Sequence, residues 1–286
     1  MKAFRPGFAK VLGLLFLLLA RPLLAAESPW ARVVVIGASA SAGFVLAEPF
    51  GGTNTARCKL NHYLDAAITP PHAPVKNVAT AMFFLSTDAL AKLEIESATN
   101  QRPTLVIGVD FLFWFCYGEA HTEAERARHF ETGLRFLEQI PCPLVIGDVP
   151  DASAATNTGI ISSEQVPSEA CRNAANRRLK EWAAQHPNVT VVPLAKFMQA
   201  TMANAAISIH GQNVPAGKSR ALLQPDQLHP GPRGATLLAL EILDGLTARQ
   251  PKFPAADIRW AQEEVLQNGL KSASRPAAAK PGPFHQ

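Results

Sequence analysis

The chain contains few cysteines, and none of them has metal-binding spacing. The four cysteines of its 286 residues are Cys58, Cys116, Cys142 and Cys171, and no two of them form a C-x-x-C pair. A zinc site built on such pairs is therefore not expected. In an exported protein these thiols could form one or two disulfides, and buried free thiols are the alternative.

The chain also lacks an excess of charge once its first 26 residues are set aside. All 286 residues together contain 27 basic and 23 acidic side chains, with a sequence pI of about 9.0. The basic residues Lys2, Arg5, Lys10 and Arg21 fall in the first 26 residues, which leaves the remainder close to neutral. The remainder has no basic surplus for binding nucleic acid, so nucleic acid is not an expected partner.

The apolar run near the N-terminus is too short to cross a bilayer. It covers residues 11–20 and is interrupted by Arg21 and Pro22, whereas a membrane-spanning helix needs roughly 20 apolar residues. Basic residues before this run and the small residues Ala25 and Ala26 after it are typical of a secretory signal peptide. We therefore expect residues 1–26 to be cleaved, the mature chain to be secreted or periplasmic, and no stable membrane insertion afterwards.

Internal repeats are missing too, and the pattern is instead an alternation of strands and helices. Five apolar, β-branched runs lie at Val33–Ile36, Val75–Val78, Thr104–Val109, Leu144–Ile146 and Val189–Val192. Such runs are typical of strands buried on both faces of a parallel sheet. Helical spacing in Glu123–Ile140 and Ser168–Gln185 supplies the connections between strands. The alternation predicts one doubly wound α/β domain with right-handed crossovers.

Two segments do not follow this alternation. Residues 150–167, rich in small and polar residues, are expected to form a long loop beside the ends of the strands. The tail "KSASRPAAAKPGPFHQ" has almost nothing to bury and should be disordered. The predicted organisation is a signal peptide at 1–26, one domain at 27–269 and a disordered tail at 270–286.

Three polar segments should meet where the strands end, which is where open α/β sheets bind ligands. They are Gly37-Ala38-Ser39 after the first strand, Gly108-Val109-Asp110 after the third, and "DQLHPGPRG" from Asp226 to Gly234. In the third segment Asp226 and His229 are three residues apart, so the carboxylate can reach one ring nitrogen locally. The other ring nitrogen is then free to take a proton from a serine hydroxyl. The alternative is a turn-capping aspartate beside a surface histidine.

Taken together, the first and last segments resemble the SGNH (GDSL-type) hydrolase family from about residue 32 to about residue 249. The resemblance implies that Ser39 is the nucleophile, His229 the general base and then acid, and Asp226 the residue that orients His229. It also implies ester hydrolysis without a metal or other cofactor. The expected fold is a flavodoxin-like three-layer α/β/α sandwich with a mainly parallel five-stranded sheet.

Both middle blocks of the family pattern are altered in this chain. The stretch "NVATAM" (residues 77–82) has no glycine where the family places an oxyanion donor, and Asp110 stands where the family has asparagine. Ala79, Gly108 and Asp110 are the candidates for oxyanion or substrate contacts. An ionised carboxylate pointing at an oxyanion would oppose it, so Asp110 is expected to be protonated, turned away, or used to support His229 or a substrate hydroxyl.

The sequence favours an exported serine esterase that acts through an acyl-enzyme on a carbohydrate O-acyl group, a lipid ester or a small ester. One alternative is a catalytically weakened or inactive binding module with the same fold. A second is an α/β-hydrolase with Ser41 as nucleophile, because "SASAG" loosely resembles G-x-S-x-G. A dinucleotide-binding loop is disfavoured, because Ser39 stands where the middle glycine of G-x-G-x-x-G is needed.

Overall fold

A parallel five-stranded sheet forms the centre of the molecule. The computed structural model describes residues 27–120 and 122–275. The sheet order is β2-β1-β3-β4-β5, and every neighbouring pair is parallel. The strands are β1 (Val33–Val35), β2 (Lys76–Asn77), β3 (Leu105–Gly108), β4 (Leu144–Gly147) and β5 (Val189–Val192). Each lies within or directly overlaps a predicted apolar run, so the prediction of a mainly parallel five-stranded sheet is confirmed.

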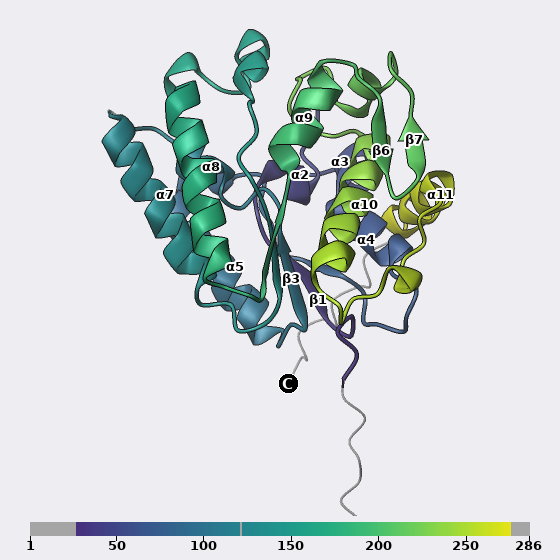
Figure 1. Cartoon of the computed structure of the whole chain (residues 1–286). Coiled ribbons are helices and arrows are strands. Elements are labelled where there is room, and N and C mark those ends of the chain that lie inside the picture. Colours follow the sequence, from purple (N-terminus) through teal and green to yellow (C-terminus); the bar gives the residue numbers. More distant parts are fainter. Residues whose placement is uncertain (1–26, 121, 276–286) are drawn as a thin grey trace, which may run out of the picture.

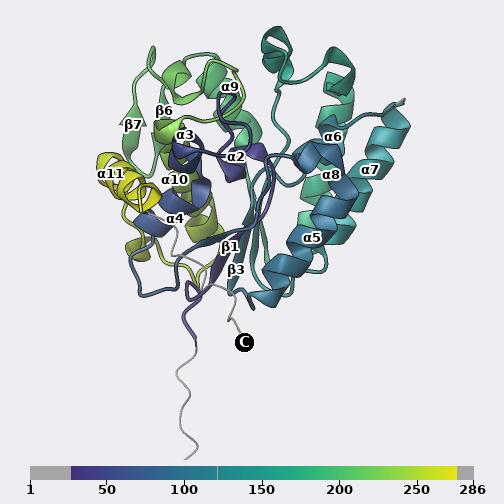
Figure 2. The same ribbon diagram turned by 180° about the vertical axis from the view of Figure 1, so that it is seen from behind.

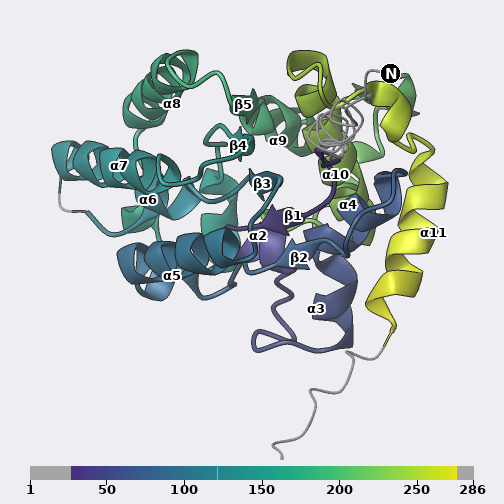
Figure 3. The same cartoon turned by 90° about the horizontal axis from the view of Figure 1, so that it is seen from below.

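Helices cover both faces of this sheet, and the view along the strands shows the three layers (Figure 3). One face is covered by α5 (Thr87–Asn100), α6 (Phe113–Tyr117), α7 (Glu123–Leu137) and α8 (Glu169–Ala184). The other is covered by α4 (Leu60–Ala67), α9 (Leu194–Met202), α10 (Pro232–Arg249) and α11 (Gln262–Ala273). Figures 1 and 2 show these two groups from opposite sides, with the sheet between them.

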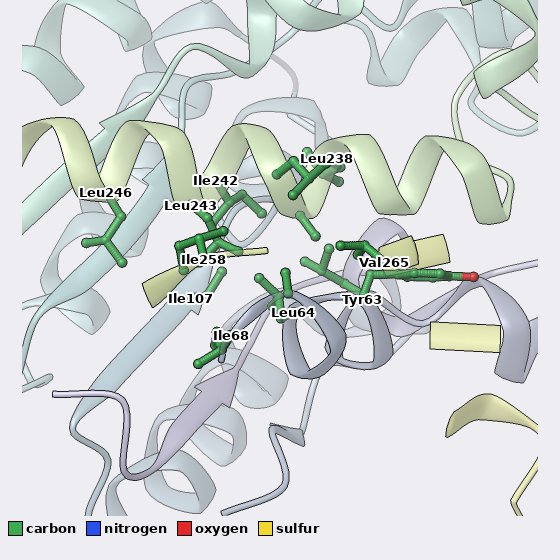
Figure 4. Packing of buried hydrophobic residues seen from close by; sticks show 14 of the residues in the cluster. Tyr63, Leu64, Ile68, Ile107, Leu238, Ile242, Leu243, Leu246, Ile258 and Val265 are labelled. Carbon is green, nitrogen blue, oxygen red and sulfur yellow. The ribbon is translucent and has the colours of Figure 1, made fainter. Parts of the chain in front are cut away.

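The alternation of side chains along the strands divides the core into two clusters. Val33 and Val35 of β1 pack with α4, α10 and α11, whereas Val34 packs with α5 to α8. This follows from the period of two residues in a strand. Figure 4 shows the first cluster, in which Tyr63 and Leu64 of α4 meet Leu238 of α10. Burial on both faces explains why the strands are apolar without interruption.

Both predicted helices are present. They end at Leu137 and Ala184, slightly earlier than their sequence patterns suggested, and each has a side-chain cap at its start. α7 begins after Thr122, whose hydroxyl accepts from the N–H of Glu125 in a capping box. α8 begins after Ser168, whose hydroxyl accepts from the N–H of Cys171. Such caps satisfy N–H groups that have no partner within the helix. The buried stripe of α7 includes Phe130 and Leu134, as the helical spacing predicted.

Two features differ from the predicted organisation. Helix α11 continues through residues 270–273, which the sequence had assigned to the disordered tail, because Val265 and Leu266 bury its apolar face against α4. A hairpin of β6 (Ile207–Ile209) and β7 (Gln212–Val214) was not predicted at all. The predicted signal peptide and the tail residues 276–286 lie outside the described residues.

Residues 150–167 form a long connection, as expected, with the short 3₁₀ helices η2 (Ser153–Thr158) and η3 (Ser163–Gln165). The structure has all four cysteines as free thiols, with Cys58 and Cys116 buried. The disulfide expectation therefore gives way to the alternative of free thiols. Within residues 27–120 and 122–275, no helix is long and apolar enough to span a membrane.

Candidate active site

Ser39 lies at the carboxyl end of β1, on the first residue of the short helix α2 (Ser39–Ala42). The chain turns out of the strand at Gly37, whose φ of 130° is unfavourable for any residue with a side chain. A Cβ atom at Gly37 would also collide with Oδ1 of Asp110. Figure 1 places α2 at the upper end of the sheet, where ligands bind in this class of fold.

Ser39, His229 and Asp226 form a continuous hydrogen-bonded relay. Ser39 Oγ lies 2.8 Å from His229 Nε2, and His229 Nδ1 lies 2.8 Å from Asp226 Oδ2. Asp226 and His229 are both buried. A carboxylate that accepts from Nδ1–H leaves Nε2 unprotonated and able to accept the serine proton. The structure thus brings together the three residues that the sequence proposed as catalytic, although they come from segments 190 residues apart.

The Asp226–His229 pair is built locally, by a turn that precedes α10. Asp226 Oδ1 accepts from the N–H groups of Leu228 and His229, both at 3.0 Å, while Oδ2 remains for the imidazole. The His229 carbonyl accepts from Gln224 N–H at 2.8 Å, and the ring of Phe44 lies 4.7 Å from that of His229. These contacts determine where His229 can point, so the base is held before substrate arrives.

The environment of Asp226 favours its ionised form. Burial alone would raise its pKa, but the hydrogen bond and electrostatic interaction with His229 and the two N–H donors outweigh that effect. The pKa of Asp226 therefore lies below its usual value. An ionised Asp226 can stabilise the imidazolium that forms when His229 takes a proton.

Two cavities meet at Ser39 and His229. The smaller, of about 60 Å³, is mostly apolar, with Phe113, Phe197 and Met198 among its lining residues, and we call it the inner cavity because most of its lining is buried. The larger, of about 320 Å³, has Phe84 and Trp114 among its lining residues, and we call it the outer cavity because its lining includes exposed side chains such as Phe84. A carbonyl carbon beside Ser39 could therefore send one substituent into each cavity.

The side chain of Asp110 is hydrogen-bonded to the nucleophile turn. Its Oδ1 accepts from Ser41 Oγ at 2.6 Å and its Oδ2 from Ser41 N–H at 3.0 Å. From the sequence, Asp110 was expected to be protonated, turned away, or used to support His229 or a substrate hydroxyl. In the structure both of its carboxyl oxygens accept from Ser41. Burial raises the pKa of Asp110, although the hydrogen bonds from Ser41 oppose this shift.

Ser41 is bound within the turn, and this geometry favours Ser39 over the α/β-hydrolase alternative with Ser41 as nucleophile. Its side chain is fully buried and its hydroxyl donates to Asp110. The imidazole that a nucleophile needs lies against Ser39 instead. Three residues after β1 therefore have separate roles. Gly37 allows the chain to turn, Ser39 faces His229, and Ser41 fixes the turn through its hydrogen bonds to Asp110.

Glu94 is a second buried carboxyl under the site, and the sequence did not reveal it. From α5 it accepts from Gly37 N–H at 2.7 Å and from Thr80 N–H at 2.9 Å. Burial raises its pKa to about 9, and the nearby Asp110 adds to this effect. Glu94 thus joins the loop that carries Ser39 to the loop that follows β2. An isolated glutamate in a helix gives no sign of this role in the sequence.

The two remaining oxyanion candidates do not line either cavity. Gly108 is buried in β3, where a Cβ would lie 2.9 Å from Ile36 Cγ1, so its small size serves packing. The Ala79 N–H donates to Asn77 Oδ1 at 3.0 Å. Asn77 also donates to the Ser41 carbonyl at 2.8 Å, so it links this loop to the nucleophile turn. Among the described residues, no group of three or more His, Cys, Asp or Glu side chains could hold a metal ion.

No protein-family model and no curated protein sequence matches this chain. Several solved structures, however, match its fold. A lipase/acylhydrolase from Enterococcus faecalis matches with a TM-score of 0.51 and 18% identity, covering 77% of this chain and 96% of that one. TesA matches with a TM-score of 0.45 and 16% identity over 77% and 99% of the two chains. A GDSL-like lipase from Parabacteroides merdae matches with a TM-score of 0.43 and 12% identity over 76% and 96%.

At such identities the first similarity shows a fold and nothing finer. The chain shares the α/β fold of that lipase/acylhydrolase, in agreement with the fold class predicted from the sequence. What this chain does must be argued from its own site.

Proposed function

We propose that this protein is an exported serine esterase that acts through an acyl-enzyme. The observation that supports this most strongly is the relay from Ser39 Oγ through His229 to Asp226, with both links at 2.8 Å. This arrangement turns a weak hydroxyl nucleophile into a reactive one by giving its proton a place to go. Export rests on the N-terminal segment of the sequence, residues 1–26.

In the proposed reaction, Ser39 Oγ attacks the ester carbonyl while His229 Nε2 takes the hydroxyl proton. The tetrahedral intermediate collapses, and His229 returns the proton to the departing alcohol. Water then attacks the acyl-enzyme, His229 takes a proton from it, and the acid leaves as Ser39 regains its hydrogen. Asp226 stays ionised throughout and stabilises the imidazolium.

The cavities favour an ester with apolar groups over an O-acylated carbohydrate. Apart from Ser39, Asp110 and His229, the inner cavity is lined by apolar side chains and proline. The outer cavity is lined largely by apolar and aromatic residues, with Gln165 as its further polar side chain. A sugar would leave most of its hydroxyls without partners on such surfaces. We therefore propose lipid esters and small apolar esters as the substrate class.

One observation favours a second candidate, a weakened enzyme or a binding module. Ala79 N–H donates to Asn77, and Asp110 accepts from Ser41, so both middle blocks are engaged in internal hydrogen bonds. The oxyanion would then depend on fewer donors, and one such donor is worth about 10²–10³ in rate.

A serine-directed phosphonate distinguishes the two candidates. We expect the mature protein to form one covalent adduct, on Ser39, with matching loss of aryl-ester hydrolysis. Ser39→Ala should abolish both adduct and hydrolysis, whereas Ser41→Ala should lower stability, because it removes the hydrogen bond to Asp110, but should still form the adduct. A protein that binds an ester analogue but forms no adduct would be a binding module. An adduct on Ser41 would contradict the proposal.

A further inference from the structure

Large apolar side chains that face solvent are concentrated around the mouth of the outer cavity. Among the described residues the exposed large apolar side chains are Leu46, Phe50, Phe84, Leu85 and Leu93. The first four lie on two loops, residues 43–52 after α2 and residues 78–86 after β2, which includes the 3₁₀ helix η1 (Phe83–Leu85). We call these four residues the apolar rim. Leu93 lies apart from them, on α5.

The apolar rim is continuous with the active site. Leu46 and Phe84, exposed by 59% and 44%, also line the cavity that reaches Ser39 and His229. The ring of Phe84 packs at 5.4 Å from that of Trp114, which holds this side of the mouth in place. Both loops are tied to the nucleophile turn: Gly37 and Thr80 share Glu94, and the N–H of Phe44 donates to the Ser39 carbonyl at 2.9 Å.

The rim extends further than a substrate in the cavity would cover. Phe50 is 93% exposed and Leu85 is 68% exposed, and neither lines the cavity. A single ester molecule bound at Ser39 would contact Leu46 and Phe84 but would leave Phe50 and Leu85 in water. Large apolar side chains displayed together outside a pocket indicate contact with a larger apolar surface.

The two loops carry almost no charge, and this indicates what kind of surface the apolar rim would contact. Residues 78–86 contain no charged side chain, and residues 43–52 contain one, Glu48. The Glu48 carboxylate turns back onto the start of α3 (Thr53–Cys58), where it accepts from Asn54 Nδ2 and Thr55 N–H. The two loops that carry the rim thus lack the basic residues that attract acidic surfaces, and their single charged side chain is little for the polar edge of a specific protein interface.

We propose that the apolar rim docks onto a lipid surface that carries no net charge, such as a phosphatidylcholine bilayer. The outer cavity would then open directly against the lipid and receive an ester from it. This inference rests on the proposed function, because it names where the ester comes from. Insertion of exposed Phe and Leu side chains into the boundary between headgroups and acyl chains requires no membrane-spanning helix.

The test measures lipid binding separately from catalysis. The mature Ser39→Ala protein is mixed with phosphatidylcholine vesicles, and the bound fraction is measured by flotation. We expect binding, and we expect Phe50→Ser and Leu85→Ser to weaken it about tenfold or more each, because each removes a large apolar group from the contact. Leu93→Ser, a change of the same kind at an exposed site outside the rim, should bind as the parent does.

With Ser39 present, Phe50→Ser and Leu85→Ser should hydrolyse a soluble short-chain aryl ester at the parental rate but a vesicle-borne ester more slowly. Absence of vesicle binding by the parent, or equal weakening by Leu93→Ser, would overturn the docking proposal. It would also be overturned if the rim variants instead dissociated a dimer in light scattering. A protein that binds vesicles through the rim but forms no phosphonate adduct on Ser39 would refute the esterase proposal and leave the docking result standing.

Discussion

The hydroxyl of Ser41 donates a 2.6 Å hydrogen bond to Asp110, and the N–H of the same serine donates to the other carboxyl oxygen at 3.0 Å. Asp110 therefore holds the turn that presents Ser39, two residues earlier on α2. Burial raises the pKa of Asp110. A larger neutral fraction of this carboxyl lessens the charge that would oppose a developing oxyanion.

Asp110→Asn should not increase the catalytic rate constant. The amide can keep both contacts, with its oxygen accepting from Ser41 N–H and its nitrogen donating to the Ser41 hydroxyl. We expect a rate within about tenfold of the parent, whereas a gain of about 10²–10³ would show that Asp110 faces the oxyanion. The measurement is kcat on an aryl ester for both proteins.

A second variant, Asp110→Ala, should lower stability and activity more than Asp110→Asn does. It leaves Ser41 N–H and Oγ without acceptors in a buried site, which costs about 1–3 kcal/mol for each orphaned group. Chemical denaturation should show the loss of stability. An alanine variant as stable and active as the parent would contradict the anchoring role.

Asp226→Asn should lower kcat by about 10⁴-fold while leaving the fold intact. The Asn oxygen would still accept from Leu228 and His229 N–H, as Asp226 Oδ1 does. The amide nitrogen would then face His229 Nδ1, and imidazole would have to accept there and carry its proton on Nε2. In that tautomer His229 cannot take the Ser39 proton. Unchanged kcat, with circular dichroism confirming the fold, would exclude this role for Asp226.

Glu94 should make the protein less stable as the pH rises. Its pKa is raised to about 9 in the fold, whereas an unfolded chain releases this proton near pH 4.3. Between these values the native state binds more protons than the unfolded state, so the free energy of unfolding falls with rising pH. For one proton the slope is at most about 1.4 kcal/mol per pH unit.

Comparison with Glu94→Gln isolates this contribution. The variant cannot titrate, and its amide leaves Gly37 or Thr80 N–H facing a donor, so we expect lower stability at pH 6 and a flatter profile up to pH 9. Urea denaturation at several pH values measures both. Parallel profiles for the two proteins would show that Glu94 is ionised throughout this range.

Thiol titration of the denatured, exported protein should find four free cysteines, because none is in a disulfide in the structure. In the native protein Cys58 and Cys116 should react slowly. Burial raises the pKa of Cys58 to about 11 and that of Cys116 to about 12, and the reactive thiolate is scarce below those values. Two titratable thiols instead of four would reveal a disulfide; Cys116 and Cys171 border one cavity and are the pair to examine.

The features of this protein that depend on short spacing could be predicted from the sequence alone. Because the strands are buried on both faces of the sheet, most of their side chains are apolar, and the strands could be recognised in the sequence as apolar runs. The three-residue spacing of Asp226 and His229 predicted a local carboxylate–imidazole pair, because a turn of that length closes on itself. The exception was α11, whose residues 270–273 lie next to a proline-rich tail that hid the end of the helix.

The contacts of the remaining polar groups could be known only from the three-dimensional structure. Asp110 had several possible partners in the sequence, and its choice of Ser41 depends on how β1 and β3 lie in register. Glu94 reaches Gly37 across 57 residues, and no local pattern encodes such a contact. The apolar rim likewise joins two loops that are separate in sequence, and whether a Phe or Leu faces solvent or core is determined by packing. These contacts form only when segments that are distant in the sequence pack side by side, and local spacing in the sequence does not specify that packing.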